Sequence, residues 1–575
     1  MDYLTHIMVM TCLYVILTTS FNLLIGYAGL FALAHAAFYA CGAYITGILL
    51  TGHAAAVFGT TLTLPFPLPM LIAAIVTALV GAVVALPALR IGGHYLVIIT
   101  LAFQVILLAV VLNSKPLTGG PDGITGVPQI ELFGWRLQEA REFLPLAAVM
   151  AALCFWICLR VANSPFGRAL KAMRENEAAA ESVGKNIVYM KVTVFMISAA
   201  LAAVAGALYA RYITFVGVES FSIEETIYIL AMVILGGTAN LWGSLAGAVL
   251  LVVLPQLLKF IDLPPDIADK SRLIIYGLLL IVILRVRPQG LVPERDTAST
   301  TGLTAQAAVE KVLPPQAERA SAEPGSVTVA GRGLARHFGG IVAVNGFDIE
   351  LKAGQVTGLI GPNGAGKTTA FNLLTGFLKP TEGAVEFRGR RVGGLKPYQV
   401  VRAGMARSFQ DLKLFTRLTV LENVMVALPG QSGDSILRVF FTPGRVRREE
   451  ATNRAKAMEV LEFVGLHDKA DEKAENLSYA EEKLLVVARL LATGAEVLLF
   501  DEPLSGLDPT TLDEILPVIR RLAEQGKTVC IIEHNLDVIK GLCDHVVFLD
   551  EGTGLAAGKP DELLADPLLA ERYFA

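Results

Sequence analysis

Long apolar runs fill the first half of this chain and end near residue 290. A helix needs about 20 predominantly apolar residues to cross a bilayer, and most of these runs reach or approach that length. The sequence therefore predicts an all-α polytopic membrane domain with eight or nine transmembrane segments. The candidate segments are 7–28, 29–50, 68–89, 95–113, 143–161, 190–212, 226–238, 241–261 and 272–286.

Charge is divided as unevenly as hydrophobicity. Residues 1–290 carry 16 Lys and Arg and 14 Asp and Glu, whereas the remaining 285 residues carry 32 and 38. No single soluble domain divides its charge in this way, so the second half is predicted to be soluble. The net charge of -4 gives no indication of nucleic-acid binding.

Basic residues predict the orientation of the membrane domain. Six Lys and Arg lie in 160–191, and Arg285 and Arg287 close the last apolar run, so both regions are expected on the cytoplasmic side. The stretch 114–142 then falls outside. The first apolar run lacks a basic region before it, because the first Lys or Arg is Arg90, and we interpret this run as a retained transmembrane helix.

A linker is predicted at 291–326, which is rich in Ala, Pro, Ser, Thr, Glu and Gln and has no periodic apolar face. The membrane domain accordingly occupies 1–290 and the soluble domain 327–575. Within 327–575, short β-type runs alternate with longer helical ones, which indicates an α/β domain.

A phosphate-binding loop follows the predicted strand 356–360. Residues 361–368 match the pattern GxxxxGK[ST], in which glycines let backbone N–H groups surround phosphates. In this pattern Lys367 can reach the β- and γ-phosphate oxygens, and the Thr368 hydroxyl can hold Mg²⁺. The candidate ATP-binding residues here are Gly361, Asn363, Gly364, Gly366, Lys367, Thr368 and Thr369.

Two carboxylates end a second apolar strand, 497–500. Asp501 is placed to anchor Mg²⁺ through water, and Glu502 to polarise the water that attacks the γ-phosphate. Together with the phosphate loop, these residues predict an ATPase that requires Mg²⁺.

Residues 327–575 resemble the ATPase of ABC transporters, with the motifs in the family's order. The resemblance implies that Gln410 contacts Mg²⁺ and water and senses the membrane domain. It also implies that His534 contacts the γ-phosphate, that Phe338 stacks on adenine and that Asp508 is the acidic residue of the D-loop.

The signature motif departs from the family's LSGGQ. Ser478 is kept, but Tyr479 and Ala480 replace the two glycines and Glu481 replaces the glutamine. A Cβ at position 480 crowds the approach of its amide to a phosphate, so this site is expected to be weaker. In the family each phosphate loop works against the signature of the opposite subunit, which implies that this chain dimerises with itself or with a homologue.

Residues 1–292 resemble the permeases of high-affinity branched-chain amino-acid (Liv-type) importers, specifically the M-type, and the ATPase half resembles the G-type subunit. The stretches that carry the permease resemblance are 21–49, 120–126, 164–174, 236–243 and 287–291. Glu177, Ala178 and Gly184 resemble the EAA loop that docks on the ATPase, although the glycine comes one residue late. The alternative is a solvated amphipathic helix.

Four ionisable residues in or near the apolar runs can be interpreted in two ways each. His35 and His94 either form hydrogen bonds in helix packing or line a pathway. Glu224 and Glu225 either begin a solvated helix or lie at the outer mouth.

The resemblance implies ATP-driven import of branched-chain or related apolar amino acids across a bacterial inner membrane, with the ATPase in the cytoplasm. Expected partners are an H-type and F-type half or a second copy of this chain, a periplasmic or lipid-anchored binding protein, and membrane lipid. Urea, short amides or aromatic acids are alternative cargoes. A membrane-anchored regulatory ATPase or a passive channel is the alternative of a different class.

Overall fold

The computed structural model describes residues 2–51, 53, 64–88, 94–132, 135–258, 277–278, 281–282, 285–294 and 323–566. Contacts divide the chain into two compact units. Unit 1 contains Met1–Arg174 and Val188–Ala298, and unit 2 contains Glu175–Ile187 and Ser299–Ala575. The boundaries predicted at 290 and 326 stay predictions, because 295–322 lies outside the described residues.

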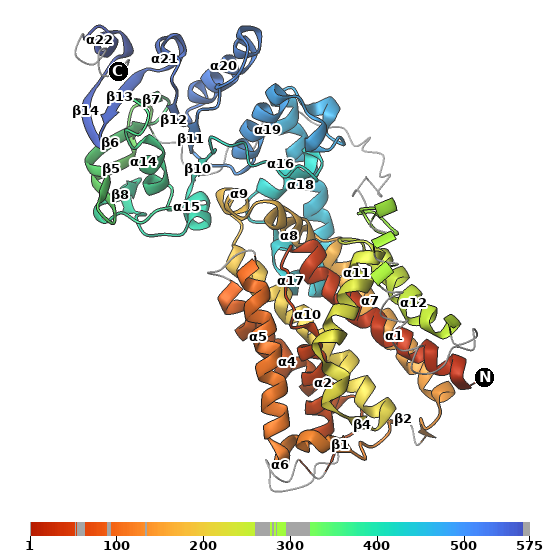
Figure 1. Cartoon of the computed structure of the whole chain (residues 1–575). Coiled ribbons are helices and arrows are strands. Elements are labelled where there is room, and N and C mark those ends of the chain that lie inside the picture. The colour runs from red at the N-terminus through yellow and green to blue at the C-terminus, as the bar shows by residue number, and fades with distance from the viewer. Residues whose placement is uncertain are drawn as a thin grey trace. The chain divides into compact units, whose positions relative to one another are not determined.

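Unit 1 is built from apolar helices, several of which lie side by side (Figure 1). The eight longest among the described residues are α1 (Asp2–Asn22), α2 (His35–Leu50), α4 (Leu68–Ala88), α5 (His94–Asn113), α7 (Ala140–Ala162), α10 (Ile187–Ile213), α11 (Ile223–Gly236) and α12 (Leu241–Leu258). One π-helical turn, η1 (Leu23–Tyr27), extends α1. The predicted all-α class of this half is confirmed.

Five helical stretches among the described residues are long and apolar enough to cross a membrane. They are Tyr3–Tyr27, Leu68–Pro87, Tyr95–Asn113, Ala140–Ala162 and Ile187–Ile213. The predicted segments 29–50, 226–238 and 241–261 correspond to the shorter helices α2, α11 and α12. The last segment, 272–286, lies mostly outside the described residues, so the count of eight or nine stays a prediction.

The loop predicted to lie outside, 114–142, contains short ordered elements. They are α6 (Lys115–Thr118), η3 (Gly120–Asp122), β1 (Ile124–Thr125), β2 (Glu131–Leu132) and β3 (Trp135–Arg136). Strand β1 pairs with β4 (Phe215–Val216), which precedes η4 (Val218–Phe221) and lies beyond α10. This pairing ties the end of α5 to the end of α10.

Asn22 joins the end of α1 to the turn between α11 and α12. Its amide nitrogen donates to Asn240 O (3.0 Å), to Gly237 O (3.3 Å) and to Ser244 Oγ (2.6 Å), and its oxygen accepts from Ala239 N (2.9 Å). The side chain is fully buried. Both the nitrogen and the oxygen of this amide are thus hydrogen-bonded inside an apolar bundle, where an unpaired polar group is costly.

Helix α8 (Pro165–Glu175) is held to η1 by a hydrogen bond and to Glu294 by ion pairs. Arg174 donates to Gly26 O (2.7 Å) and to both carboxylate oxygens of Glu294 (3.0 and 3.1 Å). Lys171, 7% exposed, contacts Glu294 at 3.1 Å. The predicted cytoplasmic cluster of basic residues thus includes two that form ion pairs within unit 1.

The ionisable candidates of unit 1 differ in their surroundings. His35 is buried, and its Nε2 contacts Leu17 O at 3.0 Å and Ser20 Oγ at 3.1 Å, as expected for helix packing. The His94 side chain lies outside the described part. Glu224 is exposed, as a solvated helix start predicts, but Glu225 is half-buried and its Oε1 has no hydrogen-bond partner among the described residues.

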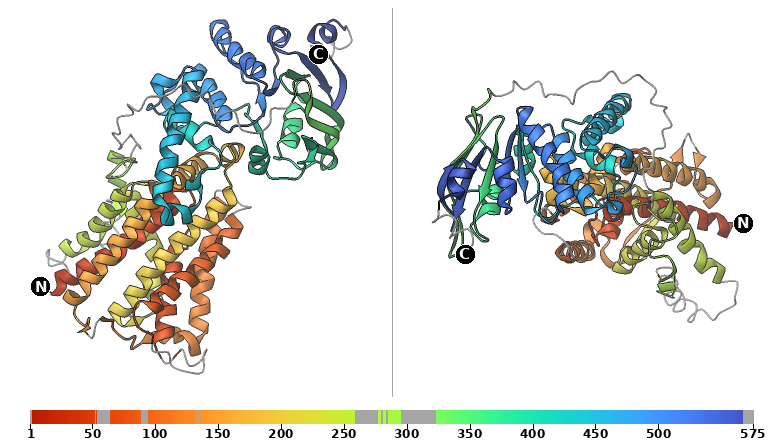
Figure 2. Two further views of the ribbon diagram at one scale, coloured as in Figure 1. Left: turned by 180° about the vertical axis from the view of Figure 1, so that it is seen from behind. Right: turned by 90° about the horizontal axis from the view of Figure 1, so that it is seen from above.

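Unit 2 is an α/β unit with two sheets (Figure 2). The six-stranded sheet has the order β10-β11-β12-β7-β13-β14 and the four-stranded antiparallel sheet has the order β6-β5-β8-β9. In the larger sheet every neighbouring pair is parallel except β13 and β14. The strands are β5 (Val327–Phe338), β6 (Ile341–Lys352), β7 (Val356–Ile360), β8 (Glu382–Phe387), β9 (Arg390–Arg391), β10 (Met405–Arg407), β11 (Val497–Asp501), β12 (Thr528–Ile532), β13 (His545–Asp550) and β14 (Thr553–Gly558).

Helices of unit 2 follow most of these strands. They are α9 (Glu177–Ser182), α14 (Lys367–Leu374), α15 (Pro397–Ala403), α16 (Val420–Ala427), α17 (Ile436–Phe441), α18 (Pro443–Phe463), α19 (Tyr479–Ala492), α20 (Pro509–Glu524), α21 (Leu536–Leu542) and α22 (Pro560–Leu564). A buried cluster that includes Phe371 of α14, Leu359 of β7 and Phe347 of β6 joins the two sheets. This core fixes α14, and with it the phosphate loop.

We predict that Asn22→Leu destabilises the apolar bundle by about 2–4 kcal/mol. The variant removes the acceptor of the Ala239 N–H and a donor to Gly237 O and Asn240 O, of which Asn240 O keeps its bond from Ser244 N. Each lost contact costs on the order of 0.6 kcal/mol in such a bundle, with more for an unpaired N–H. Thermal unfolding in detergent measures the change. Asn113→Leu is the control, because Asn113 is exposed and its side chain donates within α5, to Ala109 O. Equal melting temperatures for the two variants would contradict the prediction.

Candidate functional site

Three parallel strands bring the predicted catalytic residues to one edge of the larger sheet. Strand β12 lies between β11 and β7, with Asp501 opposite Ile532 and Ile532 opposite Leu359. Because the strands run in the same direction, the residues after each carboxyl end are neighbours. The phosphate loop therefore lies beside Glu502 and His534.

The phosphate loop has the backbone that its glycines allow. Gly361 (φ 151°) and Gly366 (φ 99°) both lie in the region that favours glycine. A Cβ on Gly361 would collide with Leu549 O, and one on Gly366 with Ala343 O. Asn363, Gly364 and Thr368 are exposed at the loop surface, and Thr369 is half-buried.

Lys367 is folded back over this loop. Its Nζ donates to Gly361 O (2.7 Å) and Pro362 O (2.9 Å), and the residue is 7% exposed. Burial lowers the pKa of Lys367, whereas the nearby carboxylates Glu502 and Asp501 raise it. The ammonium thus already lies close to both acidic residues of the site.

Asp501 is buried and only half paired. Its Oδ2 accepts from Arg407 at 3.0 Å, while its Oδ1 has no hydrogen-bond partner among the described residues. Burial raises the pKa of Asp501, and Arg407 opposes that rise. A buried carboxylate oxygen without a partner, next to a phosphate loop, fits a divalent cation such as Mg²⁺.

Glu502 is bonded on both carboxylate oxygens by predicted site residues. Gln410 Nε2 lies 3.1 Å from Oε2, and His534 Nε2 lies 3.0 Å from Oε1. The backbone of Glu502 has φ 50°, which costs energy in a non-glycine residue and occurs preferentially at functional sites. The structure thus brings Gln410, Glu502 and His534 together, although 92 residues separate the first two.

Arg407 is a residue of this site that the sequence analysis missed. It is 2% exposed, and besides Asp501 it donates to Asn372 Oδ1 (2.6 Å) and to Ser408 O (3.0 Å). Its guanidinium also lies 4.8 Å from the ring centroid of Phe409. Burial lowers its pKa to about 10. A basic residue at the end of a short apolar β-type run was the available signal.

Glu533 is a second residue that the sequence analysis missed. It is 3% exposed and accepts hydrogen bonds from Leu504 N (2.8 Å) and His534 N (3.3 Å). Burial raises its pKa to about 7. An acidic residue directly after the apolar strand β12 is a signal similar to the one that identified Asp501 at the end of β11.

The signature residues cap a helix and contact Ser505, three residues before the D-loop residue Asp508. Ser478 is the N-cap of α19 and exchanges hydrogen bonds with Glu481 in a capping box. The Tyr479 hydroxyl donates to Ser505 O at 3.2 Å. Ala480 is half-buried in the first turn of α19, so the crowding predicted from its Cβ is not tested within one chain.

The remaining candidates of unit 2, Asp508 and Phe338, have contacts of their own outside the Glu502 cluster. Asp508 is the N-cap of α20 and accepts from Thr511 N at 3.2 Å. Phe338, at the end of β5, is 42% exposed, and the Arg336 guanidinium lies 4.8 Å from its ring centroid. An exposed aromatic ring is available for stacking.

The segment that resembles the EAA loop belongs by its contacts to unit 2. Its helix α9 begins at Glu177, and the N-cap Asn176 accepts from Ala179 N at 2.9 Å. Gly184 follows the C-cap Val183 with φ 85°, and Gly184 O accepts from Arg402 Nε at 3.2 Å. Ala178 lies in the first turn.

Charged contacts fix both ends of this segment. Glu175 accepts from Arg417 N (3.2 Å) and from the Thr416 hydroxyl (3.1 Å). Lys185, 4% exposed, donates to both oxygens of Asp434 at 2.7 Å. The segment is therefore held by ion pairing and backbone bonds, unlike the solvated helix that was its alternative interpretation.

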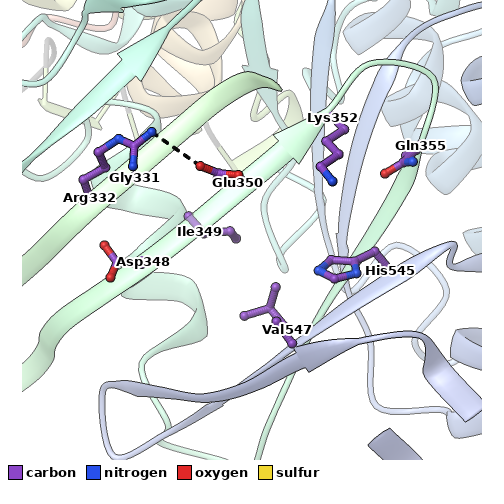
Figure 3. A pocket seen from close by; sticks show the side chains of 10 residues that line it. Gly331, Arg332, Asp348, Ile349, Glu350, Lys352, Gln355, His545 and Val547 are labelled. Carbon is purple, nitrogen blue, oxygen red and sulfur yellow. Dashed lines mark hydrogen bonds and ion pairs between the residues drawn. The ribbon is translucent and has the colours of Figure 1, made fainter. Parts of the chain in front are cut away.

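An open cavity of about 570 Å³ lies at the opposite edge of the larger sheet (Figure 3). Its lining includes Gln355, which directly precedes β7, and His545, which begins β13, so it faces the amino ends of these strands. Burial and the nearby Lys352 lower the pKa of His545. The phosphate loop follows the carboxyl end of β7, so this cavity is separate from the Glu502 cluster.

Comparisons with known proteins cover both halves of the chain. Residues 3–284 match the family described as the permease component of branched-chain amino acid transport systems, and residues 344–505 match the ABC transporter family. The branched-chain amino acid transport ATP-binding protein LivG of Salmonella typhimurium is 38% identical over 248 residues, which are 43% of this chain and 96% of LivG.

The permease protein LivM of the same organism is 36% identical over 307 residues, which cover 49% of this chain and 68% of LivM. Among solved structures, a nucleotide-free ATP-binding cassette from an ABC transporter is 32% identical, with a TM-score of 0.39. The match covers 44% of this chain and 100% of that cassette.

We predict that Glu533 makes stability depend on pH. Its pKa is about 7 in the folded protein against an ordinary 4.5, so between these values the folded protein holds a proton that the unfolded chain has released. The free energy of unfolding therefore falls as the pH rises from about 4.5 to about 7, by at most about 3 kcal/mol.

Glu533→Gln should remove this fall, which melting temperatures measured at several pH values between 5 and 8 would show. Glu524→Gln, at an exposed position of α20, is the control and should follow the wild type. Parallel curves for wild type and Glu533→Gln would show that Glu533 keeps its ordinary pKa.

Proposed function

Because the chain belongs to the family of branched-chain amino-acid ABC transporters, joining a permease region to an ATP-binding region, we propose that it imports branched-chain or related apolar amino acids. One observation carries the proposal: the two halves are similar to the permease and the ATP-binding protein of one transport system. The chain is a multi-pass membrane protein with a cytoplasmic ATPase. The proposed location is a bacterial inner membrane.

The proposed ATP site lies at the carboxyl ends of β7, β11 and β12. Backbone N–H groups of the phosphate loop and Lys367 bind the phosphates, and the exposed ring of Phe338 stacks on adenine. Thr368, Gln410 and Asp501 would hold Mg²⁺, which neutralises charge on the phosphate oxygens. The unpaired Oδ1 of Asp501 supports this assignment.

Glu502 is the proposed general base that orients the attacking water. Its carboxylate is already placed by Gln410 and His534, so a water bound there faces an acceptor of fixed orientation. ATP competes with two internal contacts, because Lys367 must leave the carbonyls of Gly361 and Pro362 to reach a phosphate. His534 then turns from Glu502 to the γ-phosphate.

The proposed assembly contains two ATPase units. Ser478, Tyr479, Ala480 and Glu481 bind the nucleotide held by the opposite subunit, which is an H-type and F-type half or a second copy of this chain. Asp508 of the D-loop lies at the same interface. A periplasmic or lipid-anchored binding protein delivers the cargo.

The segment 175–187 is the proposed coupling element. Its ends are fixed to unit 2 through Glu175 and Lys185, and its last residue, Ile187, is the first residue of α10. Movement of the ATPase is therefore passed directly to a membrane helix.

The first test of this function uses the complex purified from its native membrane through a tag on this chain, with its subunits identified. In proteoliposomes, ATP turnover and leucine uptake should both rise when the binding protein and leucine are added. Glu502→Gln should bind ATP and lower turnover by about 10²–10³-fold, because the oriented base is lost. Turnover that ignores both additions would indicate a regulatory ATPase instead, and unchanged turnover in Glu502→Gln would exclude this residue as the base.

We also predict that Lys185→Asp uncouples turnover from transport. The substitution places two carboxylates together where a largely buried ion pair stood, and losing one partner of such a pair costs about 2–5 kcal/mol. Stimulation by the binding protein should fall about tenfold or more. The exchange Lys185→Asp with Asp434→Lys should restore it, whereas Arg454→Asp, in an exposed ion pair with Asp471, should have no effect. Failure of the exchange to restore stimulation would contradict a role for this pair.

A further inference from the structure

An exposed surface that is both apolar and basic lies next to Asp434. We call it the α17 surface. Leu437 and Phe441 are 65% and 81% exposed and lie four residues apart, on one face of α17. Its other members, all exposed, are Arg438 of α17 and Arg445, Arg447 and Arg448 in the first turns of α18.

Hydrogen bonds anchor the residues just before the α17 surface to α16 and α18. Gln431 Nε2, just before it, donates to Met425 O (2.6 Å) and Leu428 O (2.9 Å) at the end of α16. Ser432 N donates to Glu449 Oε1 of α18 at 2.8 Å. The exposed side chains therefore belong to an anchored helix pair. Moving Leu437 and Phe441 out of water into apolar surroundings would be favourable.

The charge on this segment favours an anionic partner. Asp434 is neutralised by Lys185 and the Glu449 carboxylate is bonded to the Ser432 amide, while four arginines remain exposed. Two large apolar side chains beside several arginines are typical of a protein segment that lies in the interface of an anionic membrane.

The chain itself keeps this segment near a membrane surface. Lys185, the partner of Asp434, comes two residues before Ile187, where α10 begins. A helix of 27 residues is roughly 40 Å long, which is more than the hydrocarbon core and about equal to the bilayer with its headgroups. Ile187 therefore lies at headgroup level, and α17 begins two residues after Asp434.

We propose that the α17 surface lies on the cytoplasmic leaflet, with Leu437 and Phe441 among the upper acyl chains and the four arginines on anionic lipid headgroups. The ATPase is then supported by the membrane directly, in addition to its coupling segment. This proposal rests on α10 crossing the membrane and is independent of the cargo.

The first test places a fluorescent reporter on the surface. The full chain with Phe441→Trp is reconstituted in vesicles of phosphatidylcholine and phosphatidylglycerol, with and without lipids brominated near the headgroup. After subtraction of the wild-type signal, the added tryptophan should lose about half of its emission to the bromolipid. Leu555→Trp, a 43% exposed position on β14, is the control and should not be quenched.

Two results would overturn the proposal. Emission from Phe441→Trp at the wavelength of a water-exposed tryptophan, without quenching, would show that the surface faces solvent. Blue-shifted emission without quenching would show that a protein covers it. ATP turnover of the same vesicles reports separately whether the proposed transport function holds.

The second test separates headgroup charge from apolar contact. Arg447→Gln with Arg448→Gln should lower the quenching at Phe441→Trp about twofold or more. Quenching of Phe441→Trp with its arginines unchanged should fall by the same factor when phosphatidylglycerol is omitted from the vesicles. Arg390→Gln with Arg391→Gln, at exposed positions of β9, is the matched control and should have no effect. Quenching that is indifferent to anionic lipid would exclude the arginine contacts.

Discussion

The ion pair between Lys185 and Asp434 fixes the segment just before α10 to the ATPase unit. By chain order Lys185 belongs with the membrane helices, since α10 begins two residues later, yet by contact it belongs to the ATPase unit. A largely buried pair of this kind gives little net stability but penalises every arrangement in which one partner is left unpaired. The pair therefore holds Lys185 on the ATPase unit, while Glu175 does the same at the other end of the segment.

The nucleotide site was largely predictable from sequence, for a physical reason. Parallel strands bring their carboxyl ends to one edge, so the polar residues after β7, β11 and β12 had to meet once the strands were recognised. Apolar runs likewise predicted eight of the helices in unit 1. The contacts of Arg407 and Glu533 were not predictable in this way, because they depend on which strand pairs with which and on the path of a loop. The Asn22 network joins residues more than 200 positions apart and left no local pattern.

The site satisfies most of its own polar groups. Lys367 bonds to loop carbonyls, and Glu502 bonds to Gln410 and His534, so nucleotide binding exchanges internal contacts for external ones. The exception is Asp501 Oδ1, which has no such contact to give up among the described residues. The unpaired oxygen favours a cation at Asp501, whereas Lys367 and His534 must give up an internal contact to reach a phosphate.

The hydrogen bond between Tyr479 and Ser505 has a consequence for communication between the two ATP sites of the proposed dimer. In the proposed dimer the signature touches the nucleotide of the opposite subunit, while Ser505 follows Glu502, the proposed base of its own subunit, by three residues. The Tyr479 hydroxyl thus links the signature, which faces the nucleotide of the opposite subunit in the proposed dimer, to the segment that follows Glu502 in the same chain. Because Tyr479 stands where the family's signature has glycine, this bond would give the two ATP sites of the proposed dimer a direct side-chain connection within each subunit.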